Sequence, residues 1–344
     1  MKYSLYSTSL RAWDAMLMAI DQAKKSIYLE MYIFVDDMGK NHDFIGKLKH
    51  KASKGVRVII VADAFGSNEL KKETIKEIKE AGVELIFFSH WLRHIHRKVL
   101  IVDEKVAFIG GVNIGKRFAQ WNDLQLKVRG RITKTFLKSF AYTYKMAGGK
   151  DIKILKYSER KLGTKLKFWL IEHWPAKNIH TLKNHYIEKI SQAKSSIQIT
   201  TPYFTPPRWL ISLLDDAIRR GVTVEIIIPE ESDLGIINRL NYRYMYNLHQ
   251  LGIRFFLTKK MNHSKLLIID GEEGLIGSQN LDLLSFRINS EIGIFFRDLR
   301  IIHDLMKIID QWKSDSIKFE PDKYKMKTID WILLALLKTF KPIL

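Results

Sequence analysis

HRKVLIVDEKVAFIGGVN, at residues 96–113, is answered in the second half of the chain by HSKLLIIDGEEGLIGSQN, at residues 263–280. Histidine, lysine, aspartate, glycine and asparagine recur in both copies with the same spacings of two, five, seven and three residues. One such set could arise by chance. Two sets at matching places indicate that the chain is a duplication whose copies carry the same chemistry.

The repetition extends on the amino-terminal side of both segments. QAKKSI (22–27) recurs as QAKSSI (192–197), and IYLEMYIF (27–34) is matched by IQITTPYF (197–204). GVRVIIVAD (55–63) is matched by GVTVEIIIP (221–229), and AGVELIFF (81–88) by LGIRFFLT (251–258). Each copy predicts helix, strand, helix, strand, helix and strand, followed by a hairpin, which is typical of an α/β fold.

The duplication predicts four parts: a first half at 1–150, a connector at 151–185, a second half at 186–318 and a terminal segment at 319–344. Equivalent elements of a duplicated chain tend to pair with one another. We therefore expect the halves to pack face to face about a pseudo-twofold axis.

The composition indicates a polyanionic partner. The 344 residues include 57 Lys and Arg against 37 Asp and Glu, a formal charge of +20. Nucleic acid, anionic lipid headgroups or a phosphorylated substrate would all suit that charge. The chain has no cysteine, which excludes disulfide scaffolds, thiol catalysis and thiolate metal sites.

The spacing within each copy has a physical logic. Side chains two apart on a strand share a face, so His96 points the same way as Lys98, and His263 the same way as Lys265. The next strand of each copy brings an asparagine, Asn113 or Asn280, beside the histidine and lysine. The small residues before these asparagines, including Ser278, let a ligand approach the backbone. Asp103 and Asp270 fall out of phase, and a turn or salt-bridge role suits them better than chemistry.

Two imidazoles, two ammonium groups and two amides make a pocket for a tetrahedral phosphoryl group. One neutral histidine can attack phosphorus while the other, protonated, donates to the leaving oxygen. Asp123 and Glu291 follow the two asparagines at nearly equal distances and are candidates to orient the imidazoles; a surface or fold-stabilising role is the alternative. A metal site is disfavoured, because His94 and His96 offer only two ligands without a carboxylate at convincing spacing.

These motifs resemble the phospholipase D superfamily. IYLEMYIFVDD, DAFGS (63–67), HRKVLIVD, IGGVNIG (109–115), TTPYFTPP (200–207) and GSQNLD (277–282) are similar to bacterial cardiolipin synthases of that superfamily. The resemblance runs from about residue 8 to 298. It implies two α/β halves with mixed sheets flanked by helices, and one active site at their interface.

The resemblance also implies chemistry without a metal or another cofactor. His96 would be the nucleophile and His263 the acid and base. The substrate would be an anionic phospholipid such as phosphatidylglycerol. Tyr203, Phe204 and Ser278 are candidate substrate contacts, and packing in the core is the alternative for the two aromatic residues. Leu284 stands where an Arg is common, and Ser290 replaces an aromatic residue, so the acceptor alcohol stays open.

The termini bear on membrane binding. The first 20 residues favour an amphipathic helix capped by Ser7, Thr8 or Ser9 over a signal peptide. In the terminal segment, the apolar stretch from Ile329 to Leu344 is too short and too interrupted by Lys338 and Lys341 for a transmembrane span, and it favours an interfacial anchor or a helix docked on the core. We expect peripheral association at the cytoplasmic face of a membrane, with no oligomeric state implied.

Three alternatives remain at this point. A hydrolase would use water as the acceptor, and a nuclease would apply the same chemistry to DNA, although the apolar terminal segment makes nucleic acid the less favoured partner. A non-catalytic lipid-binding protein would need neither histidine.

Overall fold

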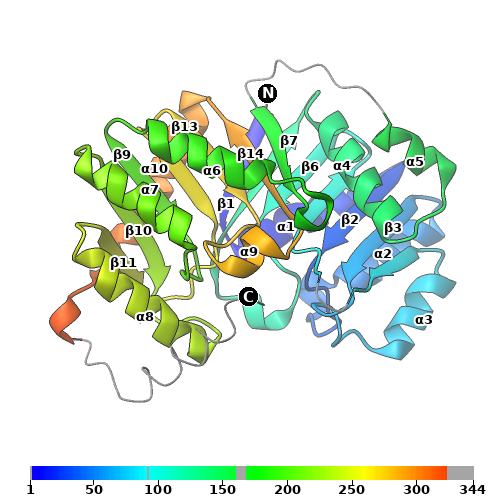
Figure 1. Ribbon diagram of the computed structural model, residues 1–344. Helices are drawn as coiled ribbons and strands as arrows, with labels where there is room; N and C mark the ends of the chain where they lie inside the picture. Colours follow the sequence, from blue (N-terminus) through cyan, green and yellow to red (C-terminus); the bar gives the residue numbers. More distant parts are fainter. Residues whose placement is uncertain (1, 91–92, 160–167, 324–344) are drawn as a thin grey trace.

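The computed structural model describes residues 2–90, 93–159 and 168–323. Two mixed β-sheets lie side by side, and helix α9 lies between them in the view of Figure 1. The expected duplicated α/β fold is confirmed, since each sheet is built from the same sequence of elements in the same order.

The first half contains the following elements: β1 (Lys2–Thr8), α1 (Ser9–Asp21), β2 (Ser26–Met31), η1 (Lys40–His42), α2 (Phe44–Ser53), β3 (Arg57–Asp63), α3 (Lys72–Glu80), β4 (Glu84–Phe88), β5 (Lys98–Val102), β6 (Val106–Gly110), η2 (Lys116–Phe118), β7 (Asn122–Arg129) and α4 (Thr133–Met146). Helix α5 (Ile152–Ser158) follows it.

The second half contains the following elements: β8 (Phe168–His173), η3 (Pro175–Lys177), α6 (Thr181–Gln192), β9 (Ser196–Thr200), α7 (Arg208–Arg219), β10 (Thr223–Pro229), α8 (Gly235–His249), β11 (Arg254–Thr258), β12 (Leu266–Ile269), β13 (Glu273–Gly277), α9 (Leu283–Arg287), β14 (Glu291–Phe296), α10 (Leu299–Ser314), β15 (Ser316–Lys318) and η4 (Pro321–Lys323).

The strand orders show the duplication directly. The first sheet runs β1-β7-β6-β5-β2-β3-β4 and the second runs β8-β14-β13-β12-β9-β10-β11-β15. In both sheets the three strands before the hairpin pair in parallel, and the hairpin pairs antiparallel to the first of them. The carboxyl ends of the parallel strands therefore meet at one edge of each sheet.

Three edge strands, β1, β8 and β15, were not expected from the sequence. Strand β1 pairs antiparallel with β7, and β8 pairs antiparallel with β14 in the equivalent position. The predicted connector at 151–185 thus holds α5, β8 and the start of α6, and part of it completes the second sheet. Strands β1 and β8 share no visible sequence motif, since an edge strand needs only alternation and pairing.

Three apolar cores hold these layers together. Helices α1 and α2 cover the outer face of the first sheet, and α6, α7 and α8 cover the outer face of the second. The third core joins the halves: Ile109 of β6 and Ile276 of β13 belong to it, together with Phe136 of α4 and Leu305 of α10. The halves therefore share a buried interface. The two repeated motifs, at 96–113 and 263–280, lie at its rim.

The central residue of the first motif contributes to that interface. Arg97 lies between His96 and Lys98 and points to the opposite face of the strand, where it is fully buried. Its guanidinium pairs with Glu30 of β2 at 3.0 Å and with Glu172 of β8 at 3.3 Å. Arg97 thus ties the motif strand to the edge strand of the other sheet.

Candidate active site

Backbone hydrogen bonds between the halves set the position of both histidines. The N–H of His96 donates to the carbonyl of Ser290 (3.0 Å), and the N–H of Ser290 donates to the carbonyl of His94 (2.8 Å). The same pattern recurs on the other side: His263 donates to Asn122 (2.7 Å), whose N–H donates to the carbonyl of Met261 (2.9 Å). Each motif loop is therefore bridged to the opposite half, the first at the start of β14 and the second at the start of β7.

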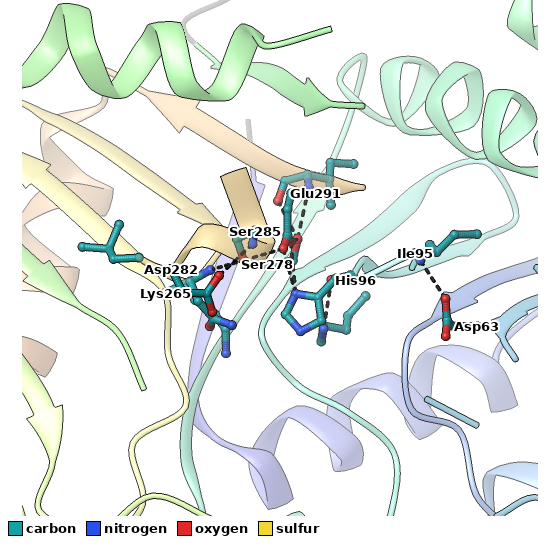
Figure 2. Close-up of polar contacts among 12 residues, drawn as sticks. Asp63, Ile95, His96, Lys265, Ser278, Asp282, Ser285 and Glu291 are labelled. Carbon is teal, nitrogen blue, oxygen red and sulfur yellow. Dashed lines mark hydrogen bonds and ion pairs between the residues drawn. The ribbon is translucent and has the colours of Figure 1, made fainter. Parts of the chain in front are cut away.

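The bridges bring each histidine to a carboxylate of the other half. The Nδ1 atom of His96 lies 3.0 and 3.1 Å from the two carboxylate oxygens of Glu291, as Figure 2 shows. The Nδ1 atom of His263 lies 2.8 Å from Oδ2 of Asp123. All four side chains are buried, His96 being 6% and His263 3% exposed. The sequence pointed to both carboxylates but not to this crossed pairing.

The two motif lysines lie behind the histidines. Lys98 Nζ donates to the carbonyl oxygen of His96 at 2.9 Å, and Lys265 Nζ donates to that of His263. Burial, and then the positive charge of Lys265, lowers the pKa of Lys98 well below its usual value. Burial lowers the pKa of Lys265 to about 8. Two buried ammonium groups that repel each other would be relieved by an anion between them.

The two motif asparagines are also buried, each 4% exposed. The carbonyl oxygen of the Asn113 backbone accepts from Trp13 Nε1 at 2.9 Å, and the N–H of Asn280 donates to Ser285 Oγ at 3.0 Å. Within the described residues, the side-chain Oδ1 of each asparagine has no hydrogen-bond partner. A buried amide oxygen without a donor is costly, and rotation of the amide would instead direct its NH2 group, a hydrogen-bond donor, to that position.

The two carboxylates beside the histidines are held differently. Glu291 accepts hydrogen bonds from the hydroxyls of Ser278 and of Ser285, the latter at 2.7 Å. Asp123 accepts from the N–H of Leu124 at 2.7 Å. Gly111 occupies the position in the first half that Ser278 occupies in the second, and a Cβ atom there would lie 2.2 Å from Oδ1 of Asp123. Close packing therefore leaves no room for a second hydroxyl beside Asp123.

Because of this difference, the pKa values of the two carboxylates shift in opposite directions. Burial alone would raise the pKa of Glu291, but the charges of His96 and Lys98 and the hydrogen bonds from His96 and Ser278 outweigh burial and lower it. Burial raises the pKa of Asp123 to about 7. Burial, followed by the charges of Lys265 and Lys98, lowers the pKa of His263. The Asp123–His263 pair can therefore take up one proton near neutral pH.

The two imidazoles are accordingly suited to different steps. Burial lowers the pKa of His96, which favours its neutral form. With Nδ1–H donating to an ionised Glu291, the lone pair of Nε2 is free to attack an electrophile. The pair of His263 and Asp123 holds a proton that could be delivered to a leaving oxygen.

We expect Ser278→Ala to lower turnover roughly tenfold, because a hydrogen bond to a buried carboxylate contributes about 1.5–3 kcal/mol. The substitution removes a donor that lowers the pKa of Glu291, so that pKa rises. Since activity requires ionised Glu291, it should be lost at a higher pH on the acid side than in the parent protein. The pH dependence of kcat/KM measures this shift.

Ser9→Ala is the matched control, because Ser9 is equally buried and its hydroxyl has no hydrogen-bond partner within the described residues. An acid limb that stays in place in Ser278→Ala would show that the hydroxyl does not tune Glu291.

The structure places the remaining candidates of the sequence in different surroundings. Tyr203 is half-buried, its ring lies 6.3 Å from that of His263, and its hydroxyl donates to Asp233 at 2.7 Å. Phe204 is fully buried and packs against Phe255 and Tyr244 in the outer core of the second half. The expectation that Phe204 contacts substrate is therefore corrected: it is a core residue, because its side chain points to the opposite face from that of Tyr203.

Asp103 and Asp270 lie away from the imidazoles at equivalent turns. Asp103 accepts from the backbone N–H groups of residues 24–26, and Asp270 from those of residues 194–196. Both adopt left-handed backbone conformations, with φ of 50° and 55°. Their contacts anchor the hairpin of each half to the start of its first parallel strand.

Four residues near the site were not assigned a role from the sequence: Asp282, Ser285, Asp63 and Trp121. Asp282 caps α9 by accepting from the N–H of Ser285 (2.7 Å), which fixes the hydroxyl that reaches Glu291 (Figure 2). Asp63 accepts from the N–H of Ile95 at 2.7 Å and so holds the loop before His96. The ring of Trp121 lies 5.3 Å from that of His263. Asp63 and Asp282 lie in the quoted motifs DAFGS and GSQNLD, but the sequence did not predict the hydrogen bonds that they make.

A cleft of about 250 Å³ adjoins the site, between Phe88, His94, Trp174 and Ser290. Among the residues that the structure describes, no three His, Cys, Asp or Glu side chains are grouped so as to hold a metal ion. The donor set at the centre is thus two imidazoles, two ammonium groups and two amides, which suits a phosphoryl group.

Comparisons with known proteins agree with this geometry. A family model described as "Cardiolipin synthase, PLD-like domain" matches residues 16–143 and 186–313. The chain is 30% identical over 359 residues to the cardiolipin synthase of Listeria welshimeri, covering 96% of this chain and 73% of that protein. It is 29% identical over 342 residues to that of Oceanobacillus iheyensis, covering 94% and 71%.

Solved structures share the fold. The phosphatidylserine synthase of Haemophilus influenzae Rd KW20 superposes with a TM-score of 0.77 at 16% identity, covering 99% of this chain and 93% of that one. A polyphosphate kinase from Porphyromonas gingivalis gives a TM-score of 0.61 at 15% identity, covering 100% and 54%. Both likenesses bear on the architecture alone.

Proposed function

The chain belongs to the cardiolipin synthase family of phospholipase-D-like proteins, and on that premise we propose that it transfers a phosphatidyl group between phospholipids through a phosphohistidine at His96. The crossed pairs of histidine and carboxylate around two buried lysines carry the proposal. They combine one neutral imidazole, one proton source and a cationic pocket in a single site.

In the first step, Nε2 of His96 attacks the phosphorus of the donor lipid. The bond from phosphorus to the headgroup oxygen breaks, and the leaving alcohol takes the proton held by His263 and Asp123. Lys98 and Lys265 stabilise the charge that develops on the non-bridging oxygens, assisted by the amides of Asn113 and Asn280. The products of this step are phosphatidyl-His96 and a free alcohol.

In the second step, His263 removes a proton from the hydroxyl of the acceptor, whose oxygen attacks phosphorus. The phosphorus–nitrogen bond breaks and His96 is restored. With phosphatidylglycerol as both donor and acceptor, the products are cardiolipin and glycerol. With water as acceptor, the product is phosphatidic acid.

The crossed pairs of histidine and carboxylate also bear on how the chain divides into domains. We propose that residues 1–150 and 186–318, the latter completed by β8 and the start of α6 from the connector, are the two halves of one catalytic unit, since each histidine is paired with a carboxylate of the other half. The distance between Nδ1 of His263 and the nearer Asp123 oxygen is only 2.8 Å, so separation of the halves would break both pairs.

Membrane association is the second component of the proposal. The formal charge of +20 suits a surface of anionic lipid. The anchor expected in the terminal segment lies beyond Lys323, outside the described residues. In the described part of the chain, no helix has the length and apolar character needed to cross a bilayer.

The direct test incubates the protein with phosphatidylglycerol vesicles and a metal chelator and identifies the products by mass spectrometry. We expect cardiolipin and glycerol in equal amounts. Phosphatidic acid without cardiolipin would make the protein a hydrolase. Absence of any product from phosphatidylglycerol and from other donor lipids would overturn the proposal, and salt-sensitive DNA cleavage by the same sample would support a nuclease instead.

A further inference from the structure

Three loops that surround the site leave from the same edge of the two sheets. The first follows β3, whose last residue, Asp63, holds the N–H of Ile95 beside His96. The second follows β10 and contains Asp233, which accepts from Tyr203 beside His263. The third segment connects β13 to β14 and contains the short helix α9, whose Ser285 donates to Glu291. Helices α3 and α8, which follow the first two loops, lie on either side of α9 in Figure 1.

All three loops carry large apolar side chains that face solvent. Phe65 is 65% exposed in the loop after β3, and Leu284 of α9 is 44% exposed. Leu234 and Ile236, at the start of α8, are 46% and 52% exposed. Strands β3 and β10 occupy equivalent positions in the duplicated sheets, so the feature appears in both copies.

These side chains are close to the catalytic residues without being among them. The ring of Phe65 lies 4.9 Å from that of His94, two residues before the candidate nucleophile. Leu284 precedes the serine that holds Glu291, and Leu234 follows the aspartate that holds Tyr203. An exposed apolar group usually marks an interaction surface when several gather round one functional site.

The charges near these loops decide which kind of contact is favoured. Lys259 and Lys260 are exposed in the loop before His263, and Lys116 is exposed in the loop after Asn113. Exposed carboxylates, including Glu69 and Glu231, lie in the same loops as the apolar residues. Charges of both signs are therefore present at this edge, so electrostatic attraction alone does not select a partner. The feature that the three segments share is their exposed apolar side chains.

We propose that Phe65, Leu234, Ile236 and Leu284 form an interfacial rim that enters the headgroup region of an anionic phospholipid bilayer and brings the site against its substrate. The proposal rests on the proposed function and adds a membrane-binding surface within residues 2–323. The rim residues belong to the segments that position Ile95, Tyr203 and Glu291, so a bilayer held against the rim would bring phospholipid close to the site. Apolar side chains at this depth contribute binding through burial, as in other interfacial proteins.

The test compares two forms of phosphatidylglycerol: long-chain lipid in vesicles and short-chain lipid dissolved as monomers. In the full-length protein, Phe65→Ser combined with Ile236→Ser should lower the rate on vesicles by roughly tenfold for each side chain removed from the interface. The rate on monomers should stay within about twofold, because neither residue contacts the reacting groups. Leu234→Ser provides a second, independent variant.

Leu299→Ser is the matched control. Leu299 is 67% exposed, as Phe65 is, but it follows β14, which begins at the site with Glu291 and ends at the far edge of the sheet. The control should act like the parent protein on both lipid forms. Sedimentation of each variant with phosphatidylglycerol vesicles reports binding separately from catalysis.

Equal rates of the rim variants and the parent on vesicles would overturn the proposal. A loss of the same size on monomers, or in the Leu299 control, would also overturn it, because the effect would then not be specific to the interface. If the parent protein transferred no phosphatidyl group in either form, the proposed function would fail, while sedimentation would still decide whether the rim binds lipid.

Discussion

His96→Ala should reduce phosphatidyl transfer by roughly 10⁴-fold or more, because it removes the atom that forms the covalent bond to phosphorus. His96 is buried, with its Nδ1 directed to Glu291, which leaves Nε2 as its only nitrogen available to substrate. The loss should appear in kcat, since the lysines and amides that hold the phosphate remain. Turnover of phosphatidylglycerol with product analysis gives the number.

The same variant tests which histidine becomes modified. Parent protein quenched during turnover should carry an acid-labile phosphatidyl group, and His263→Ala should accumulate it if the first step persists. His96→Ala should carry none. His303→Ala, in which an exposed imidazole is removed, should match the parent. A phosphatidyl group retained in His96→Ala and absent from His263→Ala would reverse the assigned roles.

Glu291→Gln should lower kcat by about 10³- to 10⁴-fold, the size of effect produced when an amide replaces the carboxylate that orients a catalytic histidine. Glutamine has nearly the same shape, but Ser278 and Ser285 donate to different oxygens of Glu291, so only one of them can still donate to the single oxygen of the amide. It cannot stabilise the positive charge that His96 acquires as it attacks. Its amide group can also select the tautomer in which Nε2 carries the proton and cannot attack.

Steady-state kinetics over a range of pH will show this effect. Because the pKa of Glu291 is lowered, the parent has the ionised carboxylate throughout the neutral range and loses it only as the pH falls. The variant should therefore be poor at every pH rather than only at low pH. Glu272→Gln, at an exposed glutamate in the turn between β12 and β13, is the control and should match the parent protein. Less than tenfold loss in Glu291→Gln would mean that His96 does not depend on its carboxylate.

Much of the fold could be predicted because the chain repeats itself. Equal spacing of apolar strands and helices in the two copies predicted the order of elements from α1 to β6 and again from α6 to β13. Strands β1 and β8 escaped prediction, since their pairing with β7 and β14 depends on distant partners rather than on a local motif. An edge strand is defined by what lies beside it.

The candidate site was predicted in composition but not in arrangement. The spacing of His96, Lys98 and Asn113 follows from a strand and the hairpin after it, which are local structures. For Phe204 the sequence left substrate contact and core packing open, because a pattern of aromatic residues does not show which side of a strand meets the core; the structure places it in the core. Its neighbour Tyr203 faces the site instead.

The sequence by itself determined the duplication and the two sets of histidine, lysine and asparagine, from which phosphoryl chemistry is predicted. Only the tertiary structure decided that Glu291 serves His96 and that Asp123 serves His263. It also decided that hydroxyls surround Glu291 while Gly111 packs against Asp123. The physical reason is distance: local spacing sets which side chains share a strand face, whereas pKa values and hydrogen-bond partners depend on burial and on groups that folding brings from the other half of the chain.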